Sequence, residues 1–214
     1  MKFINIHTHT SNQPNEWCLQ NLHAHFELIL PERNYSIGIH PWHIDTGSTQ
    51  FETLSKFASC PNVLAIGECG LDKLCNTDFQ LQEKIFIQQV GLANELGKPL
   101  IIHCVKAFTE LFFILRKQQI KVPVIIHGFN KNIRLANELI QYGYYLSFGK
   151  AVFNTNMQEV IKSTPIHQLF FENEDAHLSM QSIYEKAAAL LGMTINDLSL
   201  QVQQNTKKVL GICI

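Results

Sequence analysis

The sequence contains no long run of charge of either sign and no basic stripe. It has 17 Lys and Arg against 18 Asp and Glu, which gives a formal net charge of -1 over 214 residues. Proteins that hold long duplex nucleic acid usually carry a basic stripe, because their affinity comes from neutralising many phosphates. We therefore expect any contact with nucleic acid to be local.

The sequence also lacks an apolar stretch of the roughly 20 residues that a membrane-spanning helix needs. Near the N-terminus, Asn5 and His7 interrupt the apolar residues, so we expect no signal peptide. The six cysteines include no C-x-x-C pair. We interpret them as reduced thiols of a cytoplasmic protein. We also expect no membrane contact and no obligate protein partner.

What the sequence does contain is an alternation of strands and helices. With 46% hydrophobic residues, residues 1–214 suit a single globular domain. Apolar runs predict strands at 2–6, 17–22, 34–39, 63–67, 99–102, 123–126, 144–148 and 167–171. Helical spacing predicts helices at 48–58, 77–96, 108–115, 131–142 and 155–163, with two more in the tail. The first crossovers are expected to be loops.

Expected helix ends carry their own signals. Thr77 with Gln80 matches a capping box, and Gly97 ends that helix. In the tail, Gly192 ends one helix and Thr194 caps the next.

About eight parallel strands covered by helices predict an α/β fold, a TIM-type (β/α)8 barrel. An open doubly wound sheet is the alternative, but its glycine-rich phosphate loop after the first strand is absent. Active sites of such barrels lie at the carboxyl ends of the strands.

Polar side chains gather at those strand ends. His7 and His9 are two residues apart, so both imidazoles project from the same face of a strand. Glu68, His103 and His127 each follow a later apolar strand, and an acidic group at 172–175 follows the last. Imidazole and carboxylate are common ligands of divalent metals. So many candidate ligands suggest two ions, with Glu68 as the bridge.

Three further residues have open roles. His40 either contacts substrate or caps a loop, and Lys106 either meets an anion or begins a helix in solvent. Asp72 is either a turn residue or a partner that orients a ligand.

At this point the sequence resembles the TatD family of metal-dependent hydrolases, within the amidohydrolase superfamily. Asn5 to His9 stands where the family has D-x-H-x-H, and Gly38 to Pro41 matches G-x-H-P. Ala65 to Asp72 matches A-I-G-E-x-G-L-D, Pro99 to Cys104 resembles P-x-I-I-H, and Ile126 to Phe129 contains H-x-F. Phe171 to Glu174 lies where E-T-D is usual.

The resemblance implies a two-metal centre that hydrolyses phosphoester bonds, typically as a deoxyribonuclease. His7 and His9 would bind the first ion, His103 and His127 the second, and Glu68 both. Glu174, in the place of a metal-binding aspartate, would take a proton from a water that the two cations activate. The ions could be zinc, magnesium, manganese, nickel or iron.

Three departures from the family pattern bear on this hypothesis. Asn5 replaces an aspartate, Val105 replaces an arginine, and Glu174 replaces the metal-binding aspartate. Asp175 is the alternative candidate for the role of that metal-binding aspartate. Single-stranded DNA or a short oligonucleotide, cut from an end, is the expected substrate. The alternatives are a hydrolase of a small ester, amide or phosphoester, and an inactive metal-binding barrel.

Overall fold

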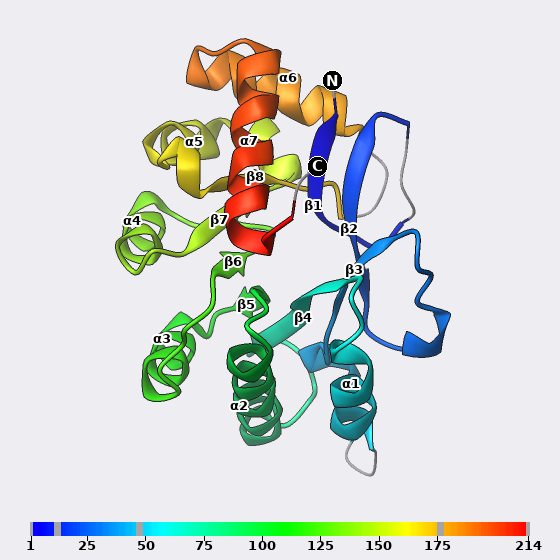
Figure 1. Ribbon diagram of the computed structural model, residues 1–214. Coiled ribbons are helices and arrows are strands. Elements are labelled where there is room, and N and C mark those ends of the chain that lie inside the picture. Colours follow the sequence, from blue (N-terminus) through cyan, green and yellow to red (C-terminus); the bar gives the residue numbers. More distant parts are fainter. Residues whose placement is uncertain (1, 11–13, 46–48, 175–177, 213–214) are drawn as a thin grey trace. The chain divides into compact units, whose positions relative to one another are not determined.

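The computed structural model describes residues 2–10, 14–45, 49–174 and 178–212 (Figure 1). Eight strands follow one another in one sheet in the order β1 to β8. Every strand pair with a described register is parallel, as the apolar runs predict. The residues group into two compact units, 1–20 with 125–214, and 21–124. That residues 1–214 form one domain stays a prediction.

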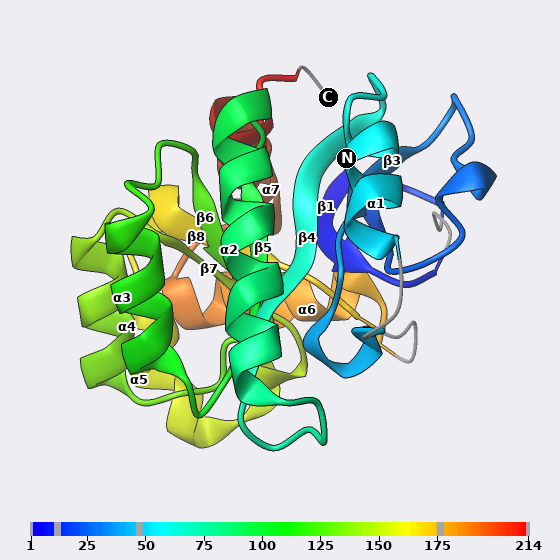
Figure 2. The ribbon, with the colours of Figure 1, turned by 90° about the horizontal axis from the view of Figure 1, so that it is seen from below.

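The unit of residues 21–124 has three strands, each of them buried along most of its length. They are β3 (Asn34–Ile37), β4 (Val63–Asp72) and β5 (Leu100–Val105). Its helices are α1 (Gln50–Ala58), α2 (Phe79–Leu96) and α3 (Phe108–Lys117), with short 3-10 turns at Phe26–Leu28 and Pro41–His43. Helix α2 packs against β4, which lies between β3 and β5 (Figure 2).

The other unit contains the two ends of the chain. Its strands are β1 (Phe3–Thr8), β7 (Tyr145–Phe148) and β8 (Leu169–Phe171), while β2 (Glu16–Leu22) and β6 (Val124–Ile126) begin or end at its border. Its helices are α4 (Ile133–Gln141), α5 (Gln158–Ser163), α6 (Met180–Leu191) and α7 (Ile195–Leu210). Three 3-10 turns lie at Lys150–Phe153, Thr155–Met157 and Ile166–Gln168. No helix of the described residues is both long and apolar enough to cross a membrane.

The strands that carry candidate ligands are longer than predicted. His7, Glu68 and His103 lie inside β1, β4 and β5, not beyond their ends. Parallel pairing continues past them, with Gly70 opposite His103 and Asp72 opposite Val105. The reason is that backbone hydrogen bonds do not depend on whether a side chain is apolar. Apolar runs therefore underestimate the length of these strands.

Helix ends agree with the sequence signals except in one case. Gly97 and Gly192 end α2 and α6 in the left-handed conformation, and the Thr194 hydroxyl accepts from the amide of Asp197. The capping box at Thr77 is wrong, since the Asp78 carboxylate accepts from the Leu81 amide and caps α2. Aspartate is as good an N-cap as threonine or better, and it lies one residue nearer the helix.

A buried tyrosine of α6 holds the backbone of β1. The Tyr184 hydroxyl donates to the carbonyl of Ile4 over 3.0 Å and accepts from its amide over 3.2 Å. The ring lies between Phe3 and Phe171, with centroids 5.0 and 4.9 Å away. Helix α6 thus satisfies two buried main-chain groups three residues before His7.

We expect Tyr184→Phe to lower the free energy of unfolding by about 1–3 kcal/mol, because it leaves the amide and carbonyl of Ile4 buried without this partner. Urea unfolding of both proteins measures the difference. Tyr142→Phe, at the exposed residue that follows α4, is the control and should change stability by less than about 0.5 kcal/mol. Equal effects of the two substitutions would contradict this role of Tyr184.

Candidate metal centre

Three candidate ligands meet in the unit of residues 21–124. His40, Glu68 and His103 each offer one ligand atom, and these atoms all lie within 4.8 Å of one another. The Glu68 carboxylate lies 3.0 Å from Nδ1 of His103 and 3.1 Å from Nε2 of His40. It is only 5% exposed. A buried carboxylate needs positive or hydrogen-bonding partners, and Nε2 of His40 is one such partner here.

His103 lies between two carboxylates. Its Nδ1 faces Glu68, and its Nε2 lies 3.0 Å from Oδ2 of Asp72. A neutral imidazole carries one proton and can donate to only one of two ionised carboxylates. If Nε2 donates to Asp72, the lone pair of Nδ1 faces an oxygen of Glu68, and a cation between them would satisfy both. These donors fit a divalent metal ion.

Asp72 is itself held by three donors. Its Oδ2 accepts from Nε1 of Trp42 over 2.6 Å as well as from His103, and its Oδ1 accepts from the amide of Leu74 over 2.7 Å. Burial by itself raises the pKa of Asp72, but the hydrogen bonds from His103, Trp42 and Leu74 outweigh burial and lower the pKa. Asp72 is therefore an ionised acceptor that fills both roles that the sequence left open, since it accepts from the amide of Leu74 in a turn and contacts His103.

The main chain fixes which nitrogen of His40 carries the proton. Nδ1 of His40 accepts from the amide of Trp42 over 3.1 Å, so Nδ1 is unprotonated. Nε2 then carries the proton and donates to Glu68. Burial is the main cause that lowers the pKa of His40, which favours this neutral form. His40 in this form is a hydrogen-bond donor and not a metal ligand.

Two buried glutamines of α2 position the segments that carry these side chains. The Gln82 amide accepts from the backbone N–H of Asp72 and donates to its carbonyl, over 2.8 and 3.0 Å. Gln89 makes the same pair of bonds with Ile39, next to His40, over 2.7 and 3.0 Å. Residues seven apart lie on one helix face, so α2 holds both segments with one surface.

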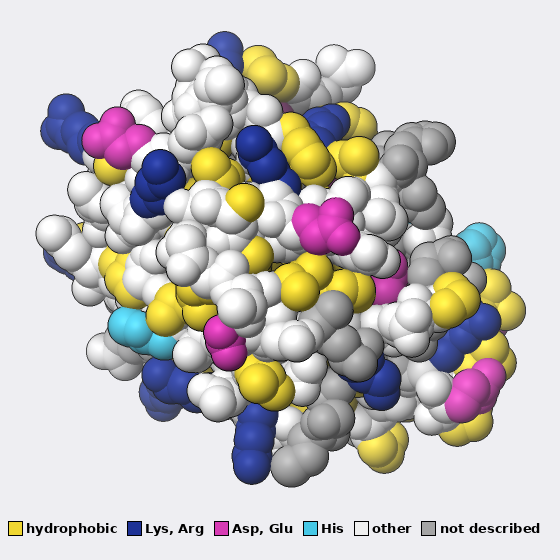
Figure 3. Space-filling model, turned by 90° about the horizontal axis from the view of Figure 1, so that it is seen from above, with side chains coloured by type: hydrophobic (Ala, Val, Ile, Leu, Met, Phe, Trp, Pro, Cys, Tyr) yellow, Lys and Arg dark blue, Asp and Glu magenta, His cyan; other side chains and the backbone are white. Residues whose placement is uncertain are grey.

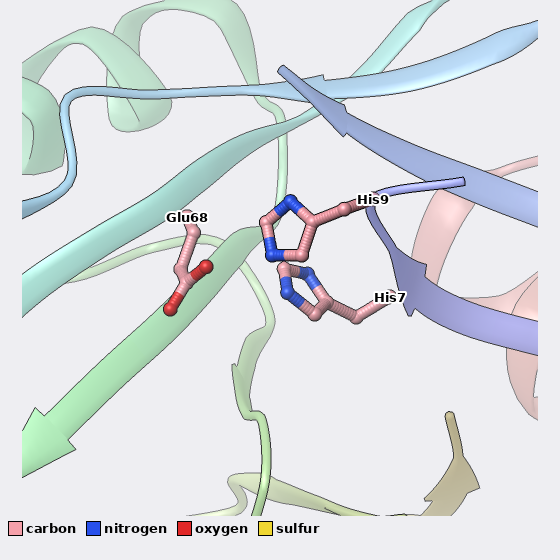
Figure 4. A group of neighbouring side chains, drawn as sticks. All are labelled: His7, His9 and Glu68. Carbon is pink, nitrogen blue, oxygen red and sulfur yellow. The ribbon is translucent and has the colours of Figure 1, made fainter. Parts of the chain in front are cut away.

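The other unit contains a second cluster, built on the end of β1. The rings of His7 and His9 lie side by side with centroids 5.1 Å apart (Figure 4). His7 is buried and its ring lies 4.4 Å from that of His127, whereas His9 is exposed. The structure thus places His127 beside His7, which lies 120 residues earlier in the sequence.

Glu172 is placed to accept the imidazole proton of His127, as Asp72 is for His103. Its buried Oε1 accepts from the amide of Gly128 over 2.7 Å and lies 3.4 Å from Nδ1 of His127. A proton on Nδ1 leaves Nε2 of His127 with its lone pair. Carboxylates in this position fix the tautomer of metal-binding histidines. The sequence counted Glu172 only as part of an acidic group.

Glu174 lies beside the H-x-H segment through its main chain. Its carbonyl accepts from the amide of His9 over 3.0 Å, and its amide donates to the carbonyl of His7 over 3.4 Å. The side chain is exposed, and φ is 52°, in the left-handed region. Non-glycine residues in this region are uncommon and cluster at functional sites. Asp175 lies outside the described residues, so the choice between Glu174 and Asp175 stays a prediction.

Asn5 has a partner that explains its presence. Its side-chain amide donates to Oδ1 of Asn173 over 2.8 Å, and its own Oδ1 accepts from the backbone N–H of Asn173 over 3.2 Å. Both residues are buried. Asn5 is a departure from D-x-H-x-H, and Asn173 lies in the stretch compared with E-T-D, so residues of two motifs contact each other and form one amide pair. This pair ties β1 to the segment after β8.

Comparison with known proteins identifies the chain. The model of TatD-related DNases matches residues 10–211. The chain belongs to the TatD family. It is 32% identical to an uncharacterised metal-dependent hydrolase of Buchnera aphidicola over 185 residues, covering 83% of this chain and 68% of that protein. It is also 30% identical to the 3'-5' ssDNA/RNA exonuclease TatD of Citrobacter rodentium, covering 71% and 60%.

Solved structures of TatD homologues show the fold. The chain aligns with YjjV of Escherichia coli with a TM-score of 0.85 at 17% identity, covering 98% of each chain. A TatD family hydrolase of Entamoeba histolytica aligns with a TM-score of 0.82 at 14% identity and the same coverage. The predicted TIM-type barrel is confirmed.

Several residues near this TatD family site are not among those that the sequence predicts. Gln82 and Gln89 are polar residues on the core-facing side of α2, and their seven-residue spacing was a readable signal. Trp42, which follows the Gly38 to Pro41 motif, has no role in the sequence-based prediction. Lys106, which the sequence proposes as an anion contact, is exposed after β5 with φ at 52°, and its role stays a prediction.

We expect Asp72→Asn to weaken metal binding by about 10- to 100-fold, because an amide no longer fixes the proton of His103 on Nε2. Calorimetric titration of the metal-free protein with Zn²⁺ or Mn²⁺ measures the change. Asp78→Asn, which alters an N-cap that asparagine serves equally well, is the matched control and should leave affinity unchanged. Unaltered affinity in Asp72→Asn would refute its orienting role.

Proposed function

We propose that this TatD family hydrolase is an exonuclease that removes nucleotides from an end of single-stranded DNA or RNA with two divalent metal ions. The observation that carries the proposal is His103 held between Asp72 and Glu68, a carboxylate–imidazole–carboxylate arrangement suited to a metal ligand. The family match supports phosphoester hydrolysis. The relative from Citrobacter rodentium, described as a 3'-5' ssDNA/RNA exonuclease, supports the choice of substrate.

Glu68 is the proposed bridge between two metal ions. Within the unit of residues 21–124 it forms a group of possible ligands with His40 and His103. We assign His7 and His9 to the first ion, as the resemblance to the family implies. Because His40 is a donor in its described form, we assign His103 and His127 as the nitrogen ligands of the second ion. Two bound cations would lower the pKa of a water and polarise a phosphoryl oxygen.

The protein's own side chains would complete the reaction. Glu174 would accept the proton of the attacking water at its carboxylate and hold the water by hydrogen bond. His40 would use its Nε2 proton to hold Glu68, and Lys106 would attract the phosphate. Asp72 and Glu172 would keep the imidazoles of His103 and His127 in the tautomer that offers a lone pair.

The charge of the surface favours a substrate held at few phosphates. On the face shown in Figure 3, Lys and Arg side chains stand at separate places among acidic and uncharged ones. Together with the net charge of -1, this pattern supports a strand end over the interior of a duplex. Five cysteines among the described residues are not joined in disulfides, which supports the proposed cytosolic location.

The protein should degrade single-stranded oligonucleotides from one end when supplied with Mg²⁺, Mn²⁺ or Zn²⁺, and should lose this activity in chelator. About three phosphate contacts at ~0.7 each predict a slope near -2 for log affinity against log salt. Gel analysis of end-labelled strands over a salt series measures both. Labels at each end show the direction of cutting.

A steep salt slope or a preference for long duplex would contradict this substrate. Turnover of small esters, amides or phosphoesters without cleavage of oligonucleotides would favour the general hydrolase. Metal binding without turnover of any of these would favour the inactive metal-binding barrel.

Glu174→Gln should lower kcat for oligonucleotide cleavage by at least ~100-fold, since the amide cannot accept the proton of the water. Glu185→Gln, the same change at an exposed position of α6, is the control and should leave kcat within about twofold. Metal content is measured for both proteins, and the second ion should remain bound. Full activity in Glu174→Gln together with loss in Asp175→Asn would transfer the role to Asp175.

A further inference from the structure

Trp42 is an exposed aromatic residue next to the candidate metal centre. It is 60% exposed, although tryptophan is usually largely buried. Its ring centroid lies 5.5 Å from that of His40 and 6.3 Å from that of His103, both at steep angles. A large aromatic ring is thus exposed to solvent beside His103, a candidate metal ligand.

The exposed indole is held in one orientation. Its Nε1–H donates to Asp72 over 2.6 Å, and Asp72 is held in turn by His103 and by the amide of Leu74. The main chain of Trp42 is also tied down, since its amide donates to His40. A ring fixed by its edge presents its flat face without a further loss of rotamer freedom on binding.

A cleft lies against this ring. It has a volume of about 340 Å³ and is lined by Trp42, Leu74, Cys75, Asn76 and Thr77. Leu74 is 64% exposed, so a second apolar side chain stands beside the indole in solvent. The amide of Asn76 and the hydroxyl of Thr77 add hydrogen-bonding groups. The size and mixed lining suit a ligand of about one nucleotide.

We propose that Trp42 is a stacking platform for a nucleobase, and that the cleft beside Leu74 takes the base of the nucleotide next to the phosphate that is cut. The proposal rests on the proposed nuclease function and adds to it the way in which the substrate is held. Stacking on an aromatic face tolerates every base, because each base has a π-face. It would supply affinity that a surface without a basic stripe does not obtain from phosphates.

Fluorescence tests the platform without any turnover. The chain has two tryptophans, and Trp17 is only 8% exposed, so quenching by a small ligand reports on Trp42. Deoxyadenosine monophosphate, added to the metal-loaded protein, should quench in a saturable way, whereas deoxyribose 5-phosphate should not. Trp42→Phe should remove the quenching. Equal quenching by the base-free phosphate, or quenching that persists in Trp42→Phe, would overturn the proposal.

Kinetics test its part in catalysis. Trp42→Ala should raise KM about tenfold for a strand with a normal terminal base, and less than twofold for one whose terminal nucleotide is abasic. Phe113→Ala, which removes an exposed ring of α3, is the matched control and should change neither. A rise in KM that is the same for both strands would assign Trp42 a merely structural role and overturn the proposal. Failure of the native protein to cut any strand would overturn the nuclease function, while the fluorescence result still decides the platform.

Discussion

The hydrogen bond between Asp72 and His103 is the interaction on which the rest of the candidate site depends. When Nε2 of His103 donates to Asp72, the lone pair of Nδ1 faces Glu68. The same carboxylate fixes the indole of Trp42. One buried aspartate therefore sets the direction of a candidate metal ligand and of the aromatic surface beside it, and its lowered pKa keeps it charged for both tasks.

In both units a buried carboxylate lies next to one nitrogen of a histidine. An imidazole near a metal must offer a lone pair from one nitrogen, so the other nitrogen needs an acceptor that holds its proton. Asp72 is that acceptor for His103, and Glu172 is that acceptor for His127. Burial of both carboxylates strengthens these contacts, because water does not compete for them.

Much of the fold and part of the site were predictable from the sequence. Strands and helices follow from apolar periodicity, and the histidines and Glu68 stand out because each lies where an apolar run of the sequence ends. The orienting carboxylates are harder to predict. Asp72 comes four residues after Glu68 along one strand, and nothing in that spacing says that His103, on the next strand, lies between them. Such a contact depends on strand register, which only pairing in three dimensions sets.

Replacements at the site are also hard to interpret from one sequence. Asn5 reads as a lost aspartate until its amide is seen paired with Asn173, 168 residues away. His40 reads as either a substrate contact or a loop cap until its Nδ1 is seen to accept from the amide of Trp42 and to cap that turn. In both cases the deciding atom belongs to the main chain or to a distant side chain, so local spacing carries no signal. The capping error at Thr77 has a smaller cause, because two good N-caps stood side by side.

The spacing of Gln82 and Gln89 along α2 sets the distance between the two backbone segments that they bind, at Asp72 and Ile39. Seven residues at about 1.5 Å per residue place Gln82 and Gln89 roughly 10.5 Å apart along the axis, and nearly two full turns bring them to one side. A single residue inserted between them would rotate one amide by about 100° and release either Ile39 or Asp72 from the helix. Changes of length beyond Gln89, toward Gly97, would not alter this spacing. Tolerance to insertion should therefore differ sharply between the two halves of one helix, for a reason unrelated to its apolar packing.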